Sequence, residues 1–194
     1  VLVQGHIKIH DPESGAVFVN KRNAIHYENM SIALAESVAN AGQGFISSMA
    51  FGNGGTSVDP TGIITYLTPN STGTNASLYN QTFTKIVDDR SVSNLDPQRN
   101  KIDTRHVNGT NYTDVVVTCL LDYGEPNGQD ATDTASASDS LYVFDELGLT
   151  SYASSGTGKL LTHVIFHPVQ KSLNRLIQID YTVRVQSLTG FNEG

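Results

Sequence analysis

Two neighbouring carboxylates are the side chains of this sequence best suited to acid–base chemistry. Asp145 and Glu146 are adjacent, and an acid–base pair works only when both carboxyl groups face one cleft. The sequence alone does not place them in one. It indicates no nucleophile either, because the Ser/Gly stretch 153–158 is typical of a turn and lacks the G-x-S-x-G pattern of hydrolases. We therefore predict no catalytic residue and a protein that is not an enzyme.

Two pairs of histidines have a spacing that suits a metal site on a helix. His163 and His167 are four residues apart, and so are His6 and His10. Both pairs lie in sequence typical of strands, where side chains four residues apart share a face but are separated by about 13 Å. Because one ion cannot be reached from both members of such a pair, we predict no metal site.

The remaining chemical candidates are a glycine-rich stretch, an acidic stretch and one cysteine. Residues 52–62 lack the lysine and the following helix of a phosphate-binding loop, which favours a tight structural loop. Asp130, Asp133 and Asp139 do not follow the alternating pattern of a calcium-binding loop, which favours a solvated acidic loop. Cys119 lies in an apolar run, where a buried side chain is expected. We predict no cofactor.

Charge and hydropathy limit the partners of the chain. Its formal net charge is −7 and its 12 basic residues are scattered singly, so no basic stripe is offered to a phosphate backbone. Its apolar runs are well short of the roughly 18 residues that span a bilayer, and its first residues lack the pattern of an export signal. We predict no direct contact with nucleic acid and no membrane association.

The candidate carboxylates, histidines and cysteine lie mostly in sequence that is typical of strands with one buried face. From Leu176 to Val185 apolar and polar residues alternate, which predicts an antiparallel strand with one face on a core and one in water. A turn at residues 11–15 predicts an N-terminal hairpin within residues 1–19. Asn108 and Gly109 together form a strong signal for a second hairpin.

One helix and two long polar stretches complete the predicted fold. A helix is expected at about residues 29–41, with Asn29 as its cap and Gly42 after its end. Residues 68–81 have few apolar anchors, which predicts an extended arm, and residues 122–140 predict a flexible acidic loop. We therefore predict one mainly β domain over residues 1–194, an antiparallel β-sandwich with an embedded α-helix and long extended loops.

Several segments together suggest a family. They are Phe144–Leu149, Leu160–Val169 with Lys171, and Leu176–Val183, with an upstream block of Met49–Thr56, Thr65–Pro69 and Ser77–Asn80. Their order resembles the C-terminal part of virion structural proteins of tailed bacteriophages, in tail- and fibre-associated domains. The segments touch roughly two thirds of the chain. The two long polar stretches exceed what a minimal module of that kind needs.

The resemblance implies a non-enzymatic structural subunit of a phage tail, neck/collar or baseplate. Such a subunit would assemble in several copies with other virion proteins, by strand pairing and arm exchange, in the bacterial host cytoplasm, and would be located in the virion. The candidates for assembly-interface residues are five aromatic side chains: Tyr66, Tyr79, Phe83, Tyr152 and Phe191.

Two other classes of function stay open at the level of sequence. A carbohydrate- or receptor-binding β-sandwich would stack a sugar ring on an exposed aromatic side chain. The chain has no Trp, so its loop tyrosines are the candidates for this role: Tyr66, Tyr79, Tyr112 and Tyr152. A hydrolase would require Asp145 and Glu146 to form an acid–base pair in a cleft.

Overall fold

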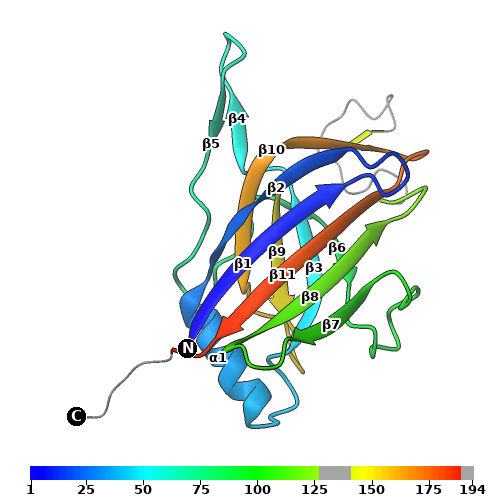
Figure 1. The fold of residues 1–194 in the computed structure, drawn as a ribbon. Helices are drawn as coiled ribbons and strands as arrows, with labels where there is room; N and C mark the ends of the chain where they lie inside the picture. The colour runs from blue at the N-terminus through cyan, green and yellow to red at the C-terminus, as the bar shows by residue number, and fades with distance from the viewer. Residues whose placement is uncertain (127–140, 189–194) are drawn as a thin grey trace.

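The computed structural model describes residues 1–126 and 141–188, and strands dominate it (Figure 1). Nine strands form one antiparallel sheet in the order β6-β3-β9-β10-β2-β1-β11-β8-β7, while β4 and β5 pair separately. The elements are, in chain order, β1 (Leu2–His10), β2 (Val17–Ile25), α1 (Tyr27–Val38), β3 (Ile46–Gly52), β4 (Thr56–Val58), β5 (Ile64–Tyr66), β6 (Gln81–Ile86), β7 (Lys101–His106), β8 (Tyr112–Leu121), β9 (Leu141–Ser151), β10 (Thr162–Ser172) and β11 (Ile177–Gln186).

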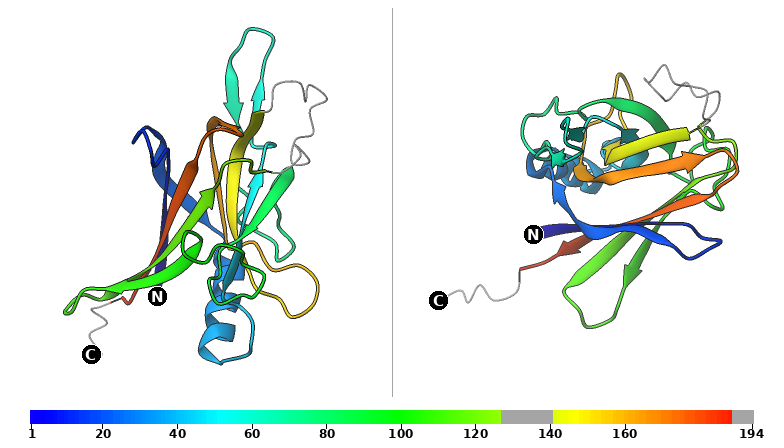
Figure 2. Two further views of the ribbon diagram at one scale, coloured as in Figure 1. Left: turned by 90° about the vertical axis from the view of Figure 1, so that its right-hand side faces the viewer. Right: turned by 90° about the horizontal axis from the view of Figure 1, so that it is seen from above.

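The large sheet curls so that its two halves face each other across a core (Figure 2). The first leaf contains β2, β1, β11, β8 and β7, and the second leaf contains β6, β3, β9 and β10. The leaves are joined where β10 meets β2, through the pairs Thr162–Ile25 and His163–Ala24. Buried apolar side chains from both leaves form one cluster. The predicted mainly β, sandwich-like fold with one helix is confirmed.

The alternation in β11 makes the first leaf one wall of the core. Ile177, Ile179 and Tyr181 are buried, whereas the polar residues between them are partly exposed. β1 and β8 flank β11 in antiparallel register and bury the same face. Cys119 of β8 is fully buried there, and burial raises the pKa of its thiol to about 12. The predicted burial of this cysteine is confirmed, and a thiol so placed is a poor nucleophile.

Aromatic rings fill the core on the side of the second leaf. Phe144 of β9 lies 5.5 Å from Phe51, 5.6 Å from Tyr142 and 5.8 Å from Phe166, measured between ring centroids. Phe83 of the edge strand β6 packs against Phe51 at 5.8 Å. All five rings belong to the second leaf, where contacts of this kind add to the stabilisation from apolar burial.

Helix α1 begins earlier than the sequence predicted. Its N-cap is His26, whose side chain accepts a hydrogen bond from the backbone N–H of Asn29, and the helix ends at Val38. Asn29 is therefore not the cap but a buried residue inside the helix, where its amide donates to the carbonyl of Leu160 at 2.9 Å. His26 therefore caps the helix through an imidazole nitrogen, although His is not among the residues that are most common at N-caps.

No helix in the described part of the chain is long and apolar enough to cross a membrane.

Both predicted hairpins are present. Asp11 Oδ1 accepts the backbone N–H groups of Glu13 and Ser14 in the turn between β1 and β2. Gly109 has a φ of 89° in the turn between β7 and β8, a value that glycine adopts at little cost.

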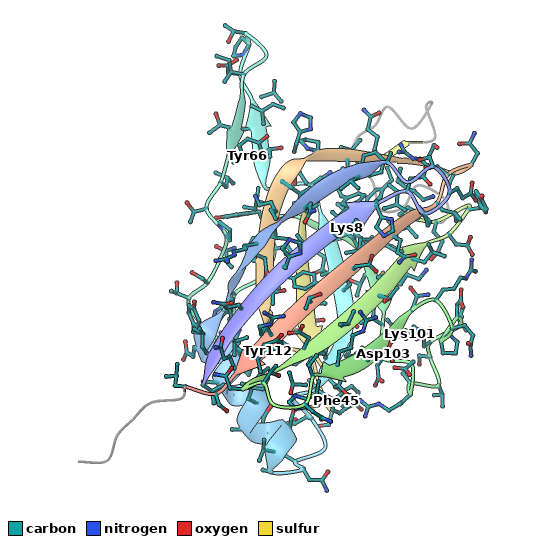
Figure 3. All side chains as sticks on the ribbon, in the orientation of Figure 1. Lys8, Phe45, Tyr66, Lys101, Asp103 and Tyr112 are labelled. Atoms are coloured by element: carbon teal, nitrogen blue, oxygen red, sulfur yellow. The ribbon has the colours of Figure 1, made fainter. Side chains whose placement is uncertain are left out.

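The outer face of the first leaf is polar and carries side chains such as Lys8, Lys101 and Asp103 (Figure 3).

The segment expected to be an extended arm folds back onto the protein. In residues 68–81 the side chain of Leu78 is buried against Ala50 and Leu160. Ala76 packs against the same cluster, so two small apolar contacts and hydrogen bonds from the backbone of this segment dock a stretch that is otherwise polar. The expected acidic loop at residues 122–140 lies outside the described residues from 127 onward.

Candidate functional site

A two-stranded hairpin, β4–β5, projects from the body of the molecule (Figures 1 and 2). Its register pairs Thr56 with Tyr66 and Val58 with Ile64. At its tip, Asp59 Oδ1 accepts the backbone N–H groups of Thr61 and Ile63 and the hydroxyl of Thr61. The hydrogen bond from the Thr61 hydroxyl, followed by that from the Ile63 amide, lowers the pKa of Asp59. The tip is therefore a closed, internally bonded turn.

Apolar side chains of this hairpin are exposed to solvent. The exposed fractions are 62% for Val58, 63% for Ile63 and 50% for Tyr66, and Leu67 directly after β5 is exposed to 42%. Tyr66 lies at the base of the hairpin (Figure 3), where it and Leu67 also line a small pocket against β2 and β10. We call Val58, Ile63, Tyr66 and Leu67 the hairpin patch. By the register of the hairpin, Val58 and Tyr66 lie on one face of the ribbon, and Leu67, one residue after Tyr66, lies on the other. Exposed apolar side chains gathered on one projection are typical of surfaces that bind another protein.

The first anchor of the hairpin is Asp145 of β9. One carboxylate oxygen accepts the backbone N–H of Gly55 at 2.9 Å. The other accepts the backbone N–H and the hydroxyl of Thr56, at 2.9 and 2.5 Å. Asp145 is 3% exposed, so these bonds form out of water, where hydrogen bonds are stronger than in solvent. They hold the chain where it leaves the body and enters β4.

The second anchor is Glu146, the next residue of β9. Its Oε1 accepts the backbone N–H of Asn80 at 2.8 Å and that of Gly54 at 3.3 Å. Its Oε2 accepts the backbone N–H of Tyr79 at 3.0 Å. Glu146 is fully buried. One carboxylate therefore binds both ends of the excursion that runs from residue 53 to residue 80 and carries the hairpin.

His163 of β10 extends this anchor. Its Nδ1 accepts the backbone N–H of Asn70 at 2.7 Å, so the ring proton is assigned to Nε2, which lies 2.8 Å from Glu146 Oε2 and donates to it. His163 is fully buried, and the ring of Tyr79 lies 5.6 Å away. A backbone amide and a carboxylate thus fix both nitrogens of the imidazole.

The protonation of Glu146 follows from these contacts. Burial works to raise its pKa, but the hydrogen bond from His163 and those from the Asn80 and Tyr79 amides together hold the pKa below its ordinary value. The group is consequently ionised in the folded protein at neutral pH. Asp145 and Glu146, with His163, act in this geometry as acceptors and donors for the protein's own backbone.

The other histidines that the sequence singled out lie apart from this anchor. His167 is exposed and bonds the carbonyl of Pro168, while His163 is buried, so the two do not share a site. His10 pairs with Asp180 at 2.8 Å on the outer face of the first leaf, and His6 is exposed. Within residues 1–126 and 141–188 no group of three or more His, Cys, Asp or Glu side chains is arranged to hold a metal ion.

Comparison with family models, with curated proteins and with solved structures found no match.

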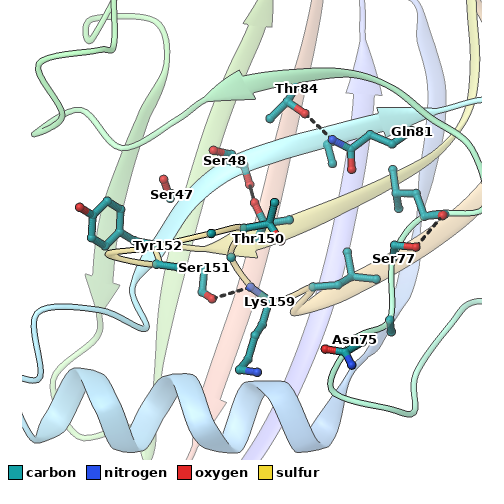
Figure 4. Close-up of a pocket in the computed structure, with 18 of the residues that line it drawn as sticks. Ser47, Ser48, Asn75, Ser77, Gln81, Thr84, Thr150, Ser151, Tyr152 and Lys159 are labelled. Atoms are coloured by element: carbon teal, nitrogen blue, oxygen red, sulfur yellow. Dashed lines mark hydrogen bonds between the residues drawn. The ribbon is translucent and has the colours of Figure 1, made fainter.

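A groove of about 580 Å³ lies on the outer side of the second leaf (Figure 4). Its floor includes Ser48 of β3, Thr84 of β6 and Thr150 of β9. Tyr152 lies at one side of the groove, while Asn75 and other residues of segment 74–78 lie at the opposite side (Figure 4). The ring of Tyr152 stacks on that of Phe45, with a centroid distance of 4.9 Å and an interplanar angle of 7°.

The structure distributes the five candidate interface residues over several places. Tyr66 belongs to the hairpin patch, and Tyr79 is exposed to 42% beside the anchor. Tyr152 lines the groove, and Phe83 is partly buried in the aromatic part of the core. Phe191 lies outside the described residues. The four described residues do not form one continuous surface.

The anchor is the functional feature that sequence reasoning missed. The sequence drew attention to Asp145 and Glu146 as a possible acid–base pair, yet their partners are backbone N–H groups of Gly54, Gly55 and Asn80 and neighbouring residues. Backbone donors leave no trace in residue type. The available signal was the placement of two adjacent carboxylates inside an otherwise apolar strand, where burial requires partners.

Proposed function

We propose that the chain is a non-enzymatic structural subunit of a tailed-phage virion, part of a tail, neck/collar or baseplate. It assembles in several copies with other virion proteins. The resemblance of residues 144–149, 160–169 and 176–183 supplies the virion context. The observation that carries the assembly role is the projecting hairpin with its exposed apolar patch.

The hairpin has the properties of a preformed docking arm. Its tip is closed by hydrogen bonds to Asp59, and its root is held by Asp145 and Glu146. A rigid arm loses little conformational freedom when it binds, so more of the contact energy appears as affinity. The exposure of Val58 and Ile63 to water is unfavourable in the isolated subunit, and burial of these side chains against a partner removes that cost.

The use of the carboxylates supports a role without catalysis. Asp145 and Glu146 were the acid–base candidates, and each is buried and occupied by N–H donors of the excursion it anchors. A general acid or base must reach a substrate proton directly or through one water molecule. Here these two groups stabilise the hairpin instead.

Strand pairing with a neighbouring subunit is better suited to one edge of the sheet than to the other. β6 and β7 are the edge strands. β7 carries Lys101, Asp103 and Arg105 at alternate positions, and such charges disfavour pairing with another chain. β6 carries one charged residue, Lys85, which is held by Glu125 at 2.6 Å. We infer that β6 is the edge available for an additional strand.

The test compares the solution mass of the wild type with that of a hairpin variant carrying Val58→Ser, Ile63→Ser and Tyr66→Ser. The matched control carries Tyr27→Ser, Val38→Ser and Val107→Ser, which change side chains of similar exposure elsewhere. We expect the wild type and the control to form oligomers and the hairpin variant to have the 20.9 kDa mass of a monomer. A hairpin variant that assembles like the wild type would contradict the role of the arm.

A further inference from the structure

The groove on the second leaf has the chemistry of a ligand site that is separate from the hairpin. Its volume of about 580 Å³ falls in the range typical of small-molecule sites. Hydroxyl and amide side chains dominate its lining, which contains no carboxylate among the described residues and one charged group, Lys159. A lining of this kind suits a ligand rich in hydroxyl groups and low in charge.

Several polar groups of the groove are available to a ligand. The dashed line at Ser48 in Figure 4 is the bond from the Thr150 hydroxyl to the Ser48 backbone carbonyl, at 3.4 Å. Among the described residues, the side-chain hydroxyls of Ser47 and Ser48 and the side-chain amide of Asn75 have no intramolecular hydrogen-bond partner. All three are at least partly exposed, so they are hydrated in the free protein. A ligand hydroxyl can replace that water with little loss of hydrogen bonding.

An ordered aromatic ring stands beside these groups. Tyr152 is exposed to 42%, and its ring is stacked on Phe45 while its backbone N–H donates to the Phe45 carbonyl at 2.7 Å. The guanidinium of Arg90 lies over the same Phe45 ring, 5.5 Å from its centroid, and is paired with Asp88 at 3.2 Å. These contacts hold the tyrosine in place before a ligand arrives.

The other tyrosines considered from the sequence are less suited to stacking a ligand. The ring of Tyr112 is covered by the guanidinium of Arg184 at 3.9 Å. The hydroxyl of Tyr79 donates to the Thr68 carbonyl beside the buried anchor. Tyr66 lies on the hairpin, away from the groove. Tyr152 alone of the four combines an exposed ring with a groove of free hydroxyl and amide groups.

We propose that this groove binds a saccharide. A pyranose ring packs its apolar face on Tyr152 and directs its hydroxyls to Ser47 and Ser48, while the Asn75 amide on the opposite side of the groove faces the far end of the ligand. Sugar rings present a C–H face and a hydroxyl edge, which match an aromatic ring beside a polar floor. This activity goes beyond assembly, and it does not depend on the hairpin patch.

The test is saturation-transfer NMR on the full chain with methyl glycosides of glucose, galactose, mannose, N-acetylglucosamine and galacturonic acid as probes. We expect at least one probe to receive saturation. Tyr152→Ala should weaken its binding about tenfold, and Tyr152→Phe should restore it because the ring is retained. Ser48→Phe, which fills the floor, should abolish the signal. Tyr27→Ala removes an exposed tyrosine outside the groove and should bind like the wild type.

Three results would overturn the proposal. The first is a wild-type protein that transfers no saturation to any of the five probes. The second is a Tyr152→Ala variant that remains folded by circular dichroism and binds as well as the wild type. The third is a Tyr152→Ala variant that loses its oligomeric state together with probe binding, which would assign Tyr152 to a subunit interface. The mass measurement on the hairpin variant reports on assembly independently of these results.

Discussion

Replacing Glu146 by glutamine tests the anchor with the smallest possible change in shape. The carboxylate accepts four N–H groups, two at each oxygen. Glutamine offers one oxygen and one NH2 group, so on one side donors must face donors. The tautomer of His163 cannot relieve this conflict, because its Nδ1 is already used as an acceptor for Asn70.

The expected cost follows from the bonds that are lost. A hydrogen bond to a charged group contributes about 1.5–3 kcal/mol, and a buried donor left unpaired costs about 1–3 kcal/mol. Because two bonds are lost and two lose their charge, we expect the free energy of unfolding to fall by about 3–5 kcal/mol. Chemical denaturation followed by far-ultraviolet circular dichroism is the suitable assay, since the chain has no Trp. Hydrogen exchange should also accelerate most at the amides of Tyr79 and Asn80.

The matched control is Glu28→Gln, in the exposed first turn of α1, where a change below about 0.5 kcal/mol is expected. If the free energy of unfolding of Glu146→Gln falls by less than about 1 kcal/mol, the Glu146 carboxylate does not anchor the excursion as described. The same conclusion would follow from a variant in which the amides of Tyr79 and Asn80 exchange no faster than in the wild type.

Three further predictions concern the acid response, the thiol and the core. Because the pKa of Glu146 is held below its ordinary value of 4.5, its contribution to stability is present above about pH 4.5 and is lost as the pH falls through the folded-state pKa. The stability gap between the wild type and Glu146→Gln should therefore narrow in acid titration, and a constant gap would contradict this assignment. Cys119 should not react with a thiol reagent at pH 8 until the protein is denatured, as its thiol is buried and its pKa is raised to about 12; rapid native reaction would mean that β8 opens. Ile179→Ala should lower the free energy of unfolding by about 2–5 kcal/mol in chemical denaturation, and Thr182→Ala on the opposite face of β11 should lower it by under about 1 kcal/mol. Equal losses in the two variants would contradict the assignment of Ile179 to the buried face.

Local patterns in the sequence predicted the regular part of the fold. The alternation of residues 176–185 is sufficient for β11, because it depends on one buried face and on the period of a strand. Asn108 and Gly109 specify their turn because glycine tolerates the positive φ found there. These features are encoded within a few neighbouring residues.

The anchor and the position of residues 68–81 could not be predicted in the same way. Glu146 and Asn80 are 66 residues apart, and the bond between them involves a backbone group that every residue type but proline possesses. The N-cap of α1 differs from the predicted Asn29 for a related reason. Asn29 is a common cap residue, but its amide satisfies the carbonyl of Leu160, 131 residues away in sequence, and His26 caps the helix instead.

The solution mass of the wild-type protein shows whether this chain is an assembling structural subunit. The measurement is multi-angle light scattering over a concentration series, with negative-stain images of the same peak. We expect a discrete oligomer, visible as a closed ring or another symmetric particle, at a mass that is a multiple of 20.9 kDa. A monomer at every concentration would contradict it.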